Sequence, residues 1–270
     1  MCPHCRAFIT TDDKICPYCG LEVGPQAAER RTSSGALGGL IPHAHFTTVM
    51  ILLINTGLYA AMVLHSTKTD ARGGGLDLDP QTLFDFGAKY RPAIQAGQWW
   101  RLITAGFLHG GLLHILMNSW VLFDLGAQVE ESFGTSRYLV FYFVSTITGF
   151  LASFYWSPAL SIGSSAGIFG LIGAMIALGV RDRSSYGAMV RSVYMRWAIY
   201  GLLLGLLPFF ATDNAAHVGG IAGGFVIAYA AGTPGYSRLV ERVWQIAAGI
   251  AMALTAAAFV QMFLWLTAAK

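Results

Sequence analysis

Long apolar runs recur along most of the chain and constrain its fold more than any other feature. The first, Phe46–Leu64, is long enough to cross a hydrocarbon core of about 30 Å. Only 11% of the 270 residues are charged, whereas soluble domains carry about 25%. The mean hydropathy is +0.55. The sequence therefore predicts an all-α, polytopic membrane protein.

Seven of these runs are expected to be transmembrane helices. The net charge of +3 is too small to indicate a nucleic-acid partner. The chain carries 32 glycines, and most of them fall inside the apolar runs, as in closely packed membrane helices. The predicted spans are Phe46–Leu64, Leu112–Leu125, Tyr138–Trp156, Ser165–Val180, Trp197–Ala211, Ala215–Ala231 and Val243–Thr267.

Two C-x-x-C pairs stand near the start of the sequence: Cys2 with Cys5, and Cys16 with Cys19. Four thiolates at this spacing are typical of a structural Zn²⁺ ion, and two disulfides or a redox pair are the alternatives. A segment this short cannot build its own core, so metal binding would supply its folding free energy. We expect a zinc ribbon over residues 1–24 in a reducing compartment, with an unknown partner, and a flexible linker over 25–44.

Polar side chains interrupt three of the predicted spans. Ser165 begins the fourth span, His217 lies in the sixth, and His109, His114 and Asn118 lead the second. Such groups are costly inside a bilayer and by default mark a functional site. His114 and Asn118 are four residues apart and so share a helix face. A metal site competes with this interpretation, but no carboxylate or cysteine in that helix completes a ligand set.

The distribution of basic residues predicts the orientation of the spans. The short loops after the third and fifth spans carry no Lys or Arg, and nine arginines fall on the opposite side. The long connection over residues 66–111 lies outside despite its basic residues, since long loops follow the rule poorly. We therefore expect a cytoplasmic N-terminus and an external C-terminus. Asn118, Ser165 and His217 would then lie at similar depth near the outer leaflet.

These polar residues have the chemistry that peptide-bond hydrolysis needs. Ser165 can act as the nucleophile and His217 as its base. Gly163 and Gly167 would allow the close approach that a short Ser–His hydrogen bond requires. No acidic residue lies beside His217 in its helix, so a dyad is expected. Donors to the oxyanion are the Asn118 amide, the His114 imidazole and the Ser165 backbone N–H.

Five motifs closely resemble the rhomboid family of intramembrane serine proteases, over roughly residues 45–232. The seventh predicted span, over residues 243–267, is similar to the extra C-terminal helix of six-plus-one rhomboids. The zinc ribbon lies outside the family pattern. The motifs are Trp100-Arg101, His109-x4-His114-x3-Asn118, Glu130 with Phe133-Gly134-x-x-Arg137, Gly163-Ser164-Ser165-Ala166, and Ala216-His217-x-x-Gly220.

The resemblance implies roles for individual residues. Ser165 and His217 would be the catalytic dyad, and His114 and Asn118 would serve the oxyanion. The family pattern is usually Gly-x-Ser-Gly, whereas Ala166 follows the serine here and adds a methyl group without removing a catalytic atom. Supporting roles fall to Arg101 and Glu130 as structural polar anchors, Phe169 packing on the histidine, and His109, Gly163 and Gly220 beside the site.

The resemblance also implies an activity. The chain would be an integral membrane serine endopeptidase, expected in a bacterial cytoplasmic membrane, that needs no cofactor for catalysis. Its substrates would be single-span membrane proteins whose helix tops unwind to expose a bond. Apart from the resemblance, Phe209 and Phe210 at the end of the fifth span could gate lateral entry or be ordinary lipid-facing or interfacial aromatics. The alternatives are a catalytically silent adaptor that binds membrane helices, and a transporter with a histidine proton relay. Silent relatives typically lack the serine or the histidine, and a transporter would need more ionisable residues in its spans.

Overall fold

The computed structural model describes residues 15–20, 46–68, 76–207, 212–235 and 237–268. The chain divides into two compact units, Met1–Phe46 and Thr47–Lys270. In the first unit, residues 15–20 form a turn in which the Gly20 N–H donates to the Cys16 carbonyl oxygen over 2.8 Å. Cys16 is buried and Cys19 is half-buried on this turn. Cys2 and Cys5 lie outside the described residues, as does the predicted linker.

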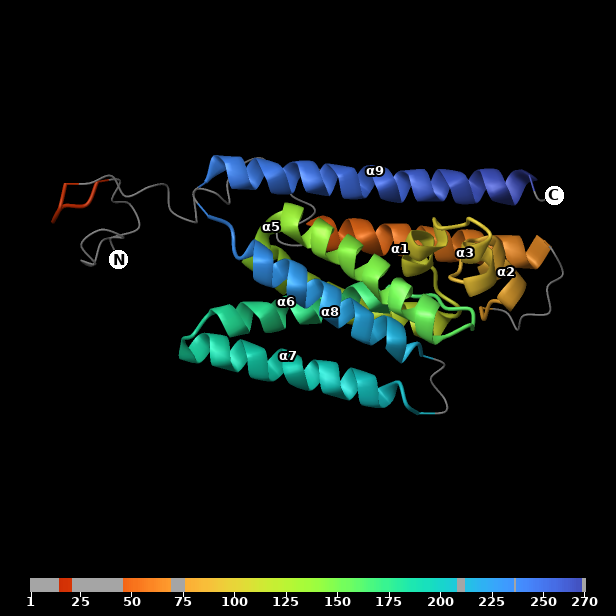
Figure 1. Cartoon of the computed structure of the whole chain (residues 1–270), viewed down its shortest axis with the longest axis horizontal. Coiled ribbons are helices and arrows are strands. Elements are labelled where there is room, and N and C mark those ends of the chain that lie inside the picture. Colours follow the sequence, from red (N-terminus) through yellow and green to blue (C-terminus); the bar gives the residue numbers. More distant parts are fainter. Residues whose placement is uncertain (1–14, 21–45, 69–75, 208–211, 236, 269–270) are drawn as a thin grey trace. The chain divides into compact units, whose positions relative to one another are not determined.

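Helices account for most of the described part of the second unit (Figure 1). Three of them, α1, α5 and α9, are long and apolar enough to cross a bilayer, and α6 is a shorter apolar helix. The predicted all-α, polytopic membrane fold is confirmed. The long helices are α1 (Phe46–Lys68), α5 (Leu112–Trp156), α6 (Ser165–Arg181), α7 (Ser185–Leu204), α8 (Asn214–Ala231) and α9 (Arg238–Ala268).

Two of the predicted spans form a single element, α5. Its two arms meet at Gly134, whose φ of 75° and ψ of 161° are not helical. A glycine adopts this backbone conformation without the steric cost that a side chain would add. The predicted spans Leu112–Leu125 and Tyr138–Trp156 are therefore separate helical arms that meet at Gly134. The other residues expected to form a loop between them are helical.

The start of α7 differs from the prediction. The helix begins at Ser185, twelve residues before the expected Trp197, because the Ser184 hydroxyl caps its first turn by accepting from the Gly187 N–H over 3.3 Å. Arg191 and Arg196 are exposed in the first part of this helix. A prediction from apolar runs therefore misses that part. The end of the predicted span, including Phe209 and Phe210, lies outside the described residues.

The long connection between α1 and α5 is folded rather than extended over the surface. Its described residues, 76–111, contain three short helices and one turn of 3₁₀ helix, and their apolar side chains pack into a small core that includes Leu83, Phe86 and Leu108. These elements are α2 (Pro80–Asp85), α3 (Arg91–Gln95), α4 (Arg101–Thr104) and η4 (Ala105–Phe107).

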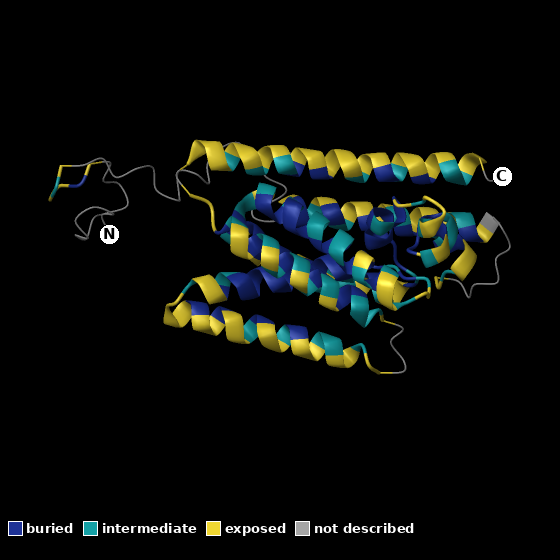
Figure 2. Cartoon of the chain, viewed as in Figure 1, coloured by how far each residue is buried: buried dark blue, intermediate teal, exposed yellow. Residues whose placement is uncertain are grey.

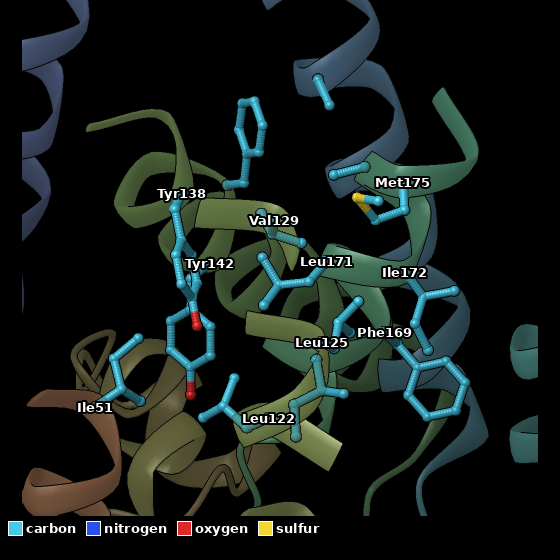
Figure 3. Close-up of a cluster of buried hydrophobic side chains, with 14 of the residues drawn as sticks. Ile51, Leu122, Leu125, Val129, Tyr138, Tyr142, Phe169, Leu171, Ile172 and Met175 are labelled. Atoms are coloured by element: carbon cyan, nitrogen blue, oxygen red, sulfur yellow. The ribbon is translucent and has the colours of Figure 1, made fainter. Parts of the chain in front are cut away.

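Helix α6 lies at the centre of the bundle. It packs against α5, α7 and α8, and its residues from Ala166 to Ala177 are all buried (Figure 2). Figure 3 shows Phe169, Leu171 and Met175 of α6 among side chains from both arms of α5. Because α6 is buried on every side, its N-terminus is held firmly where Ser165 begins the helix.

The backbones of α6 and α8 approach closely at small residues. A methyl group built on Gly220 would lie 2.2 Å from the Ala166 carbonyl oxygen, and one built on Gly224 would lie 1.9 Å from the Gly170 carbonyl oxygen. Side chains at these positions would force the helices apart, as expected for small-residue packing in membranes. This contact fixes the separation between the residues that begin the two helices.

We predict that Gly224→Ala destabilises the bundle by about 1–3 kcal/mol, because the methyl group has no space beside Gly170. Thermal unfolding in detergent measures the loss. Gly249→Ala on α9 is the matched control, since nothing lies within 4 Å of that position. Equal unfolding temperatures for the two variants would contradict the close approach.

Candidate active site

The segment that leads into α6 is shaped by Gly163. Its φ of +125° is rarely adopted by other residues, and a methyl group there would lie 2.9 Å from His114 Nε2. The Gly163 N–H donates to the Ala105 carbonyl oxygen over 2.9 Å. The chain then turns into α6 at Ser164, and Ser165 occupies the first helical position, half-buried. This places the Ser165 hydroxyl at a helix N-terminus, where backbone N–H groups lack intrahelical partners.

Ser165 and His217 are brought together from two helices. The distance from Ser165 Oγ to His217 Nε2 is 3.0 Å, a hydrogen-bond length. His217 lies in the first turn of α8 and is 5% exposed. The Phe169 ring stacks on its imidazole with centroids 4.0 Å apart and planes 10° apart, as the family resemblance implies. The stacked ring restricts the imidazole to the plane in which Nε2 faces the serine.

Asn214 is a neighbour of His217 that the sequence analysis did not single out. Its amide Nδ2 donates to the Leu202 carbonyl oxygen over 3.1 Å, which leaves Oδ1 as an acceptor 3.2 Å from His217 Nδ1. This assigns the proton to Nδ1 and leaves Nε2 bare to accept from Ser165. The dyad therefore has a third, neutral member. Its signal was the three-residue spacing from Asn214 to His217, which places both on one helix face.

The histidines of the second predicted span surround the approach to Ser165. His114 Nδ1 accepts from the Gly110 N–H over 3.4 Å, which leaves the proton on Nε2, the nitrogen facing Gly163. The His109 ring packs edge-on to His114 with centroids 5.1 Å apart. His109 Nε2 lies 3.2 Å from Ser164 Oγ. His114 therefore presents an N–H donor toward the Gly163–Ser165 segment. His109 packs against the His114 ring and contacts the Ser164 hydroxyl.

Asn118 is less directly placed. Its amide nitrogen donates to the His114 carbonyl oxygen over 3.1 Å, within its own helix. The side chain is half-buried and retains a second N–H. The predicted sharing of a helix face by His114 and Asn118 thus holds.

Arg101 and Glu130 each bind several backbone or hydroxyl groups away from the serine. Arg101 is fully buried and donates from Nη1 to the carbonyl oxygens of Phe84 and Ala88 over 2.6 and 3.0 Å. Glu130 accepts from the Thr47 N–H over 3.2 Å and from the Thr135 hydroxyl over 2.8 Å. Neither side chain touches the dyad, in keeping with the anchoring roles that the resemblance implies.

Ala166 fits because its methyl group faces α5 rather than the dyad. A methyl group built on Gly149 would lie 2.8 Å from the Ala166 Cβ. Ala166 itself is fully buried in a small cluster with Ala105, Phe150 and Ala216. The bare α-carbon of Gly149 therefore makes the space that the extra methyl group needs.

Lys89 is a second residue that the sequence analysis missed. It is fully buried and its Nζ donates to the carbonyl oxygens of Ser157 and Ala159 over 2.6 and 3.0 Å. Burial lowers the pKa of this amine, and the Asp213 carboxylate opposes that shift. No local sequence pattern predicts this contact, because the two acceptor carbonyls are about seventy residues away from Lys89 in sequence.

The fold and the site define an integral membrane protein with a serine–histidine pair between its helices. The Rhomboid domain matches residues 96–234. The chain is 36% identical over 198 residues to rhomboid protease GluP of Bacillus subtilis (strain 168), covering 72% of this chain and 38% of that protein. It is 30% identical over 267 residues to Rhomboid-like protease 1 of Toxoplasma gondii, covering 92% and 89%. The chain belongs to the rhomboid family.

Relatives differ in length and in activity. The chain spans 38% of the length of GluP, 44% of RHOMBOID-like protein 7 of Arabidopsis thaliana and 57% of Rhomboid-like protease 3 of Toxoplasma gondii. It is also 34% identical over 137 residues to Inactive RHOMBOID-like protein 8 of Arabidopsis thaliana, covering 50% of this chain and 38% of that protein. Family membership is thus compatible with a protease and with a silent relative, and the site geometry has to decide between them.

We predict that, in a protease reaction at this site, Asn214→Ala lowers kcat by about ten- to a hundredfold with little change in KM, because the imidazole loses the acceptor that fixes its tautomer. Steady-state kinetics of cleavage of a single-span reporter protein measure kcat and KM separately. Asn214→Asp is the matched control, since it keeps an acceptor for Nδ1–H and should retain more activity. Equal kcat for Asn214→Ala and wild type would exclude a positioning role.

Proposed function

We propose that this chain is an intramembrane serine endopeptidase that cleaves single-span membrane proteins. One observation carries the proposal: Ser165 Oγ lies 3.0 Å from a His217 Nε2 whose ring is held by Phe169 and Asn214. A nucleophile, a base and an orienting group in this geometry form the activated arrangement of serine hydrolases. A silent helix-binding adaptor would have no need of it.

The proposed reaction proceeds through an acyl-enzyme. Ser165 Oγ attacks the carbonyl carbon of the scissile bond while its proton passes to His217 Nε2. The Ser165 N–H, the His114 imidazole and the Asn118 amide stabilise the oxyanion. The C–N bond then breaks as His217 returns the proton to the leaving amine. Water, deprotonated by His217, hydrolyses the ester and restores the serine hydroxyl.

The proposed substrate class rests on the family, and the position of the pair supports it. His217 is almost entirely buried and Ser165 is half-buried within a bundle of membrane helices. A helical substrate has its peptide bonds engaged in its own hydrogen bonds, so its backbone must unwind before Ser165 can reach a carbonyl. The proposed substrates are therefore single-span proteins with a segment that leaves the helix easily.

We predict that Ser165→Ala abolishes cleavage of a single-span reporter in liposomes, by at least about a thousandfold, while thermal unfolding stays close to wild type. Loss of the nucleophile removes covalent catalysis without removing packing contacts. Ser164→Ala is the matched control, because that neighbouring hydroxyl contacts His109 and not His217. Substantial cleavage by Ser165→Ala would exclude this residue as the nucleophile.

The same assay tests the role of the base. Neutral imidazole accepts the serine proton, so wild-type activity should fall as pH drops through the histidine pKa, ordinarily near 6.5. A rate that rises from pH 8 to pH 5 would contradict the role of His217. No cleavage by folded wild type across several reporters would favour the adaptor instead.

We also propose that Cys2, Cys5, Cys16 and Cys19 hold one structural Zn²⁺ ion. The shared turn of Cys16 and Cys19 supports this, since Gly20 with φ of +72° closes it in the manner of a metal knuckle. Among the described residues no group of three ligands is present, and two of the four cysteines lie outside them.

The full chain purified under reducing conditions should contain about one zinc per molecule, and Cys16→Ser should lose most of it because three ligands bind more weakly. Elemental analysis measures the ratio, with Tyr18→Phe on the same turn as the control. Wild-type protein without zinc would refute the ribbon.

A further inference from the structure

Helix α9 lies at the margin of the bundle and is mostly exposed along its length (Figure 2). It packs chiefly against α5 and α4. At its beginning, Glu241 forms a bidentate ion pair with the buried Arg137 of α5, over 2.6 and 2.9 Å. Towards its end, two aromatic side chains reach inward to the segment that precedes α5. These inward contacts distinguish α9 from a span that only faces lipid.

Trp265 completes an aromatic enclosure around the Arg101 guanidinium. The guanidinium carbon lies 4.0 Å from the Phe84 ring centroid, 4.6 Å from that of Trp100 and 5.0 Å from that of Trp265. Trp265 also meets Phe84 edge-on at 5.5 Å. Cation–π attraction is strongest where the cation is desolvated, and Arg101 is fully buried. Trp265 therefore fixes both Arg101 and the residues that Arg101 binds.

A second aromatic contact lies six residues earlier on α9. The Phe259 ring packs edge-on against Phe107 of η4, with centroids 5.5 Å apart. Phe107 in turn packs on Tyr142 of α5 at 5.9 Å. The short stretch from α4 to η4 is thus held by α9 at both of its ends, at Arg101 and at Phe107.

This held stretch is bonded directly to the segment that carries the nucleophile. Ala105, within η4, accepts the Gly163 N–H over 2.9 Å. Arg101 donates to the Ala88 carbonyl, and the next residue, Lys89, forms an antiparallel bridge with Ser161 through bonds of 2.9 and 3.0 Å. Gly163, two residues before Ser165, is therefore bonded directly to the stretch that α9 holds. Ser161, four residues before Ser165, is linked to it through Lys89, Ala88 and Arg101.

We propose that Trp265 and Phe259 make α9 a positioning element of the active site, which holds the Arg101–Phe107 stretch and through it the Gly163–Ser165 segment. The inference rests on the proposed protease function. Loss of Trp265 lets Arg101 and the Ala88–Lys89 backbone shift, and the serine then leaves its alignment with His217. Small displacements of this kind cost rate rather than substrate affinity.

The test compares full-length Trp265→Ala, Trp265→Phe and Phe263→Ala with wild type. Phe263 is the matched control, because it lies on the same stretch of α9 but is 60% exposed. We expect Trp265→Ala to lower kcat and the rate of fluorophosphonate labelling of Ser165 on the order of tenfold, with KM nearly unchanged. Trp265→Phe should recover most of both rates, since it keeps an aromatic face for Arg101.

Hydrogen exchange provides a readout that needs no activity. The Ser161 and Gly163 amides should exchange on the order of tenfold faster in Trp265→Ala and at wild-type rates in Phe263→Ala. Unchanged exchange and labelling in a Trp265→Ala protein that is merely less stable would overturn the inference. If wild type neither cleaves nor labels, the protease proposal fails, and the exchange rates still decide whether α9 holds this segment.

Discussion

The close approach of α6 and α8 is the constraint on which the site depends. Ala166 and Gly170 face Gly220 and Gly224 across backbones that leave no room for a side chain. Because Ser165 begins one helix and His217 lies in the first turn of the other, the separation of the helices sets the 3.0 Å between Ser165 Oγ and His217 Nε2. The packing of α6 against α8 therefore also sets the geometry of the serine–histidine pair.

The two sides of the pair are supported by different means. His217 is fixed within the bundle, by Phe169 from α6 and by Asn214 from its own helix. Ser165 is preceded by an extended segment that has no helix of its own and is bonded instead to Lys89 and Ala105. The position of that segment therefore depends on the connection to which it is hydrogen-bonded. The connection between α1 and α5 is therefore part of the site's framework rather than a surface loop.

Much of the fold and of the candidate site could be predicted from the sequence. Hydropathy indicated the membrane helices, since long apolar runs are typical of transmembrane segments. Polar side chains within such runs are energetically costly, and this marked Ser165, His217 and His114 as candidate site residues. Boundaries were less predictable: the two arms of α5 meet at the non-helical Gly134 rather than through a longer loop, and α7 begins twelve residues early behind a serine cap. Helices that extend beyond their apolar stretch carry no hydropathy signal for the extension.

The sequence by itself determined the class of protein, its family motifs and the chemical groups available for a reaction, because these are encoded in residue type and short-range spacing. Only the tertiary structure decided that Asn214 orients the histidine, that the Ala166 methyl group fits beside Gly149, and that Lys89 and Trp265 hold segments far from them in the chain. The physical reason is that such contacts form between a side chain and distant backbone or rings. No periodicity within either partner records them.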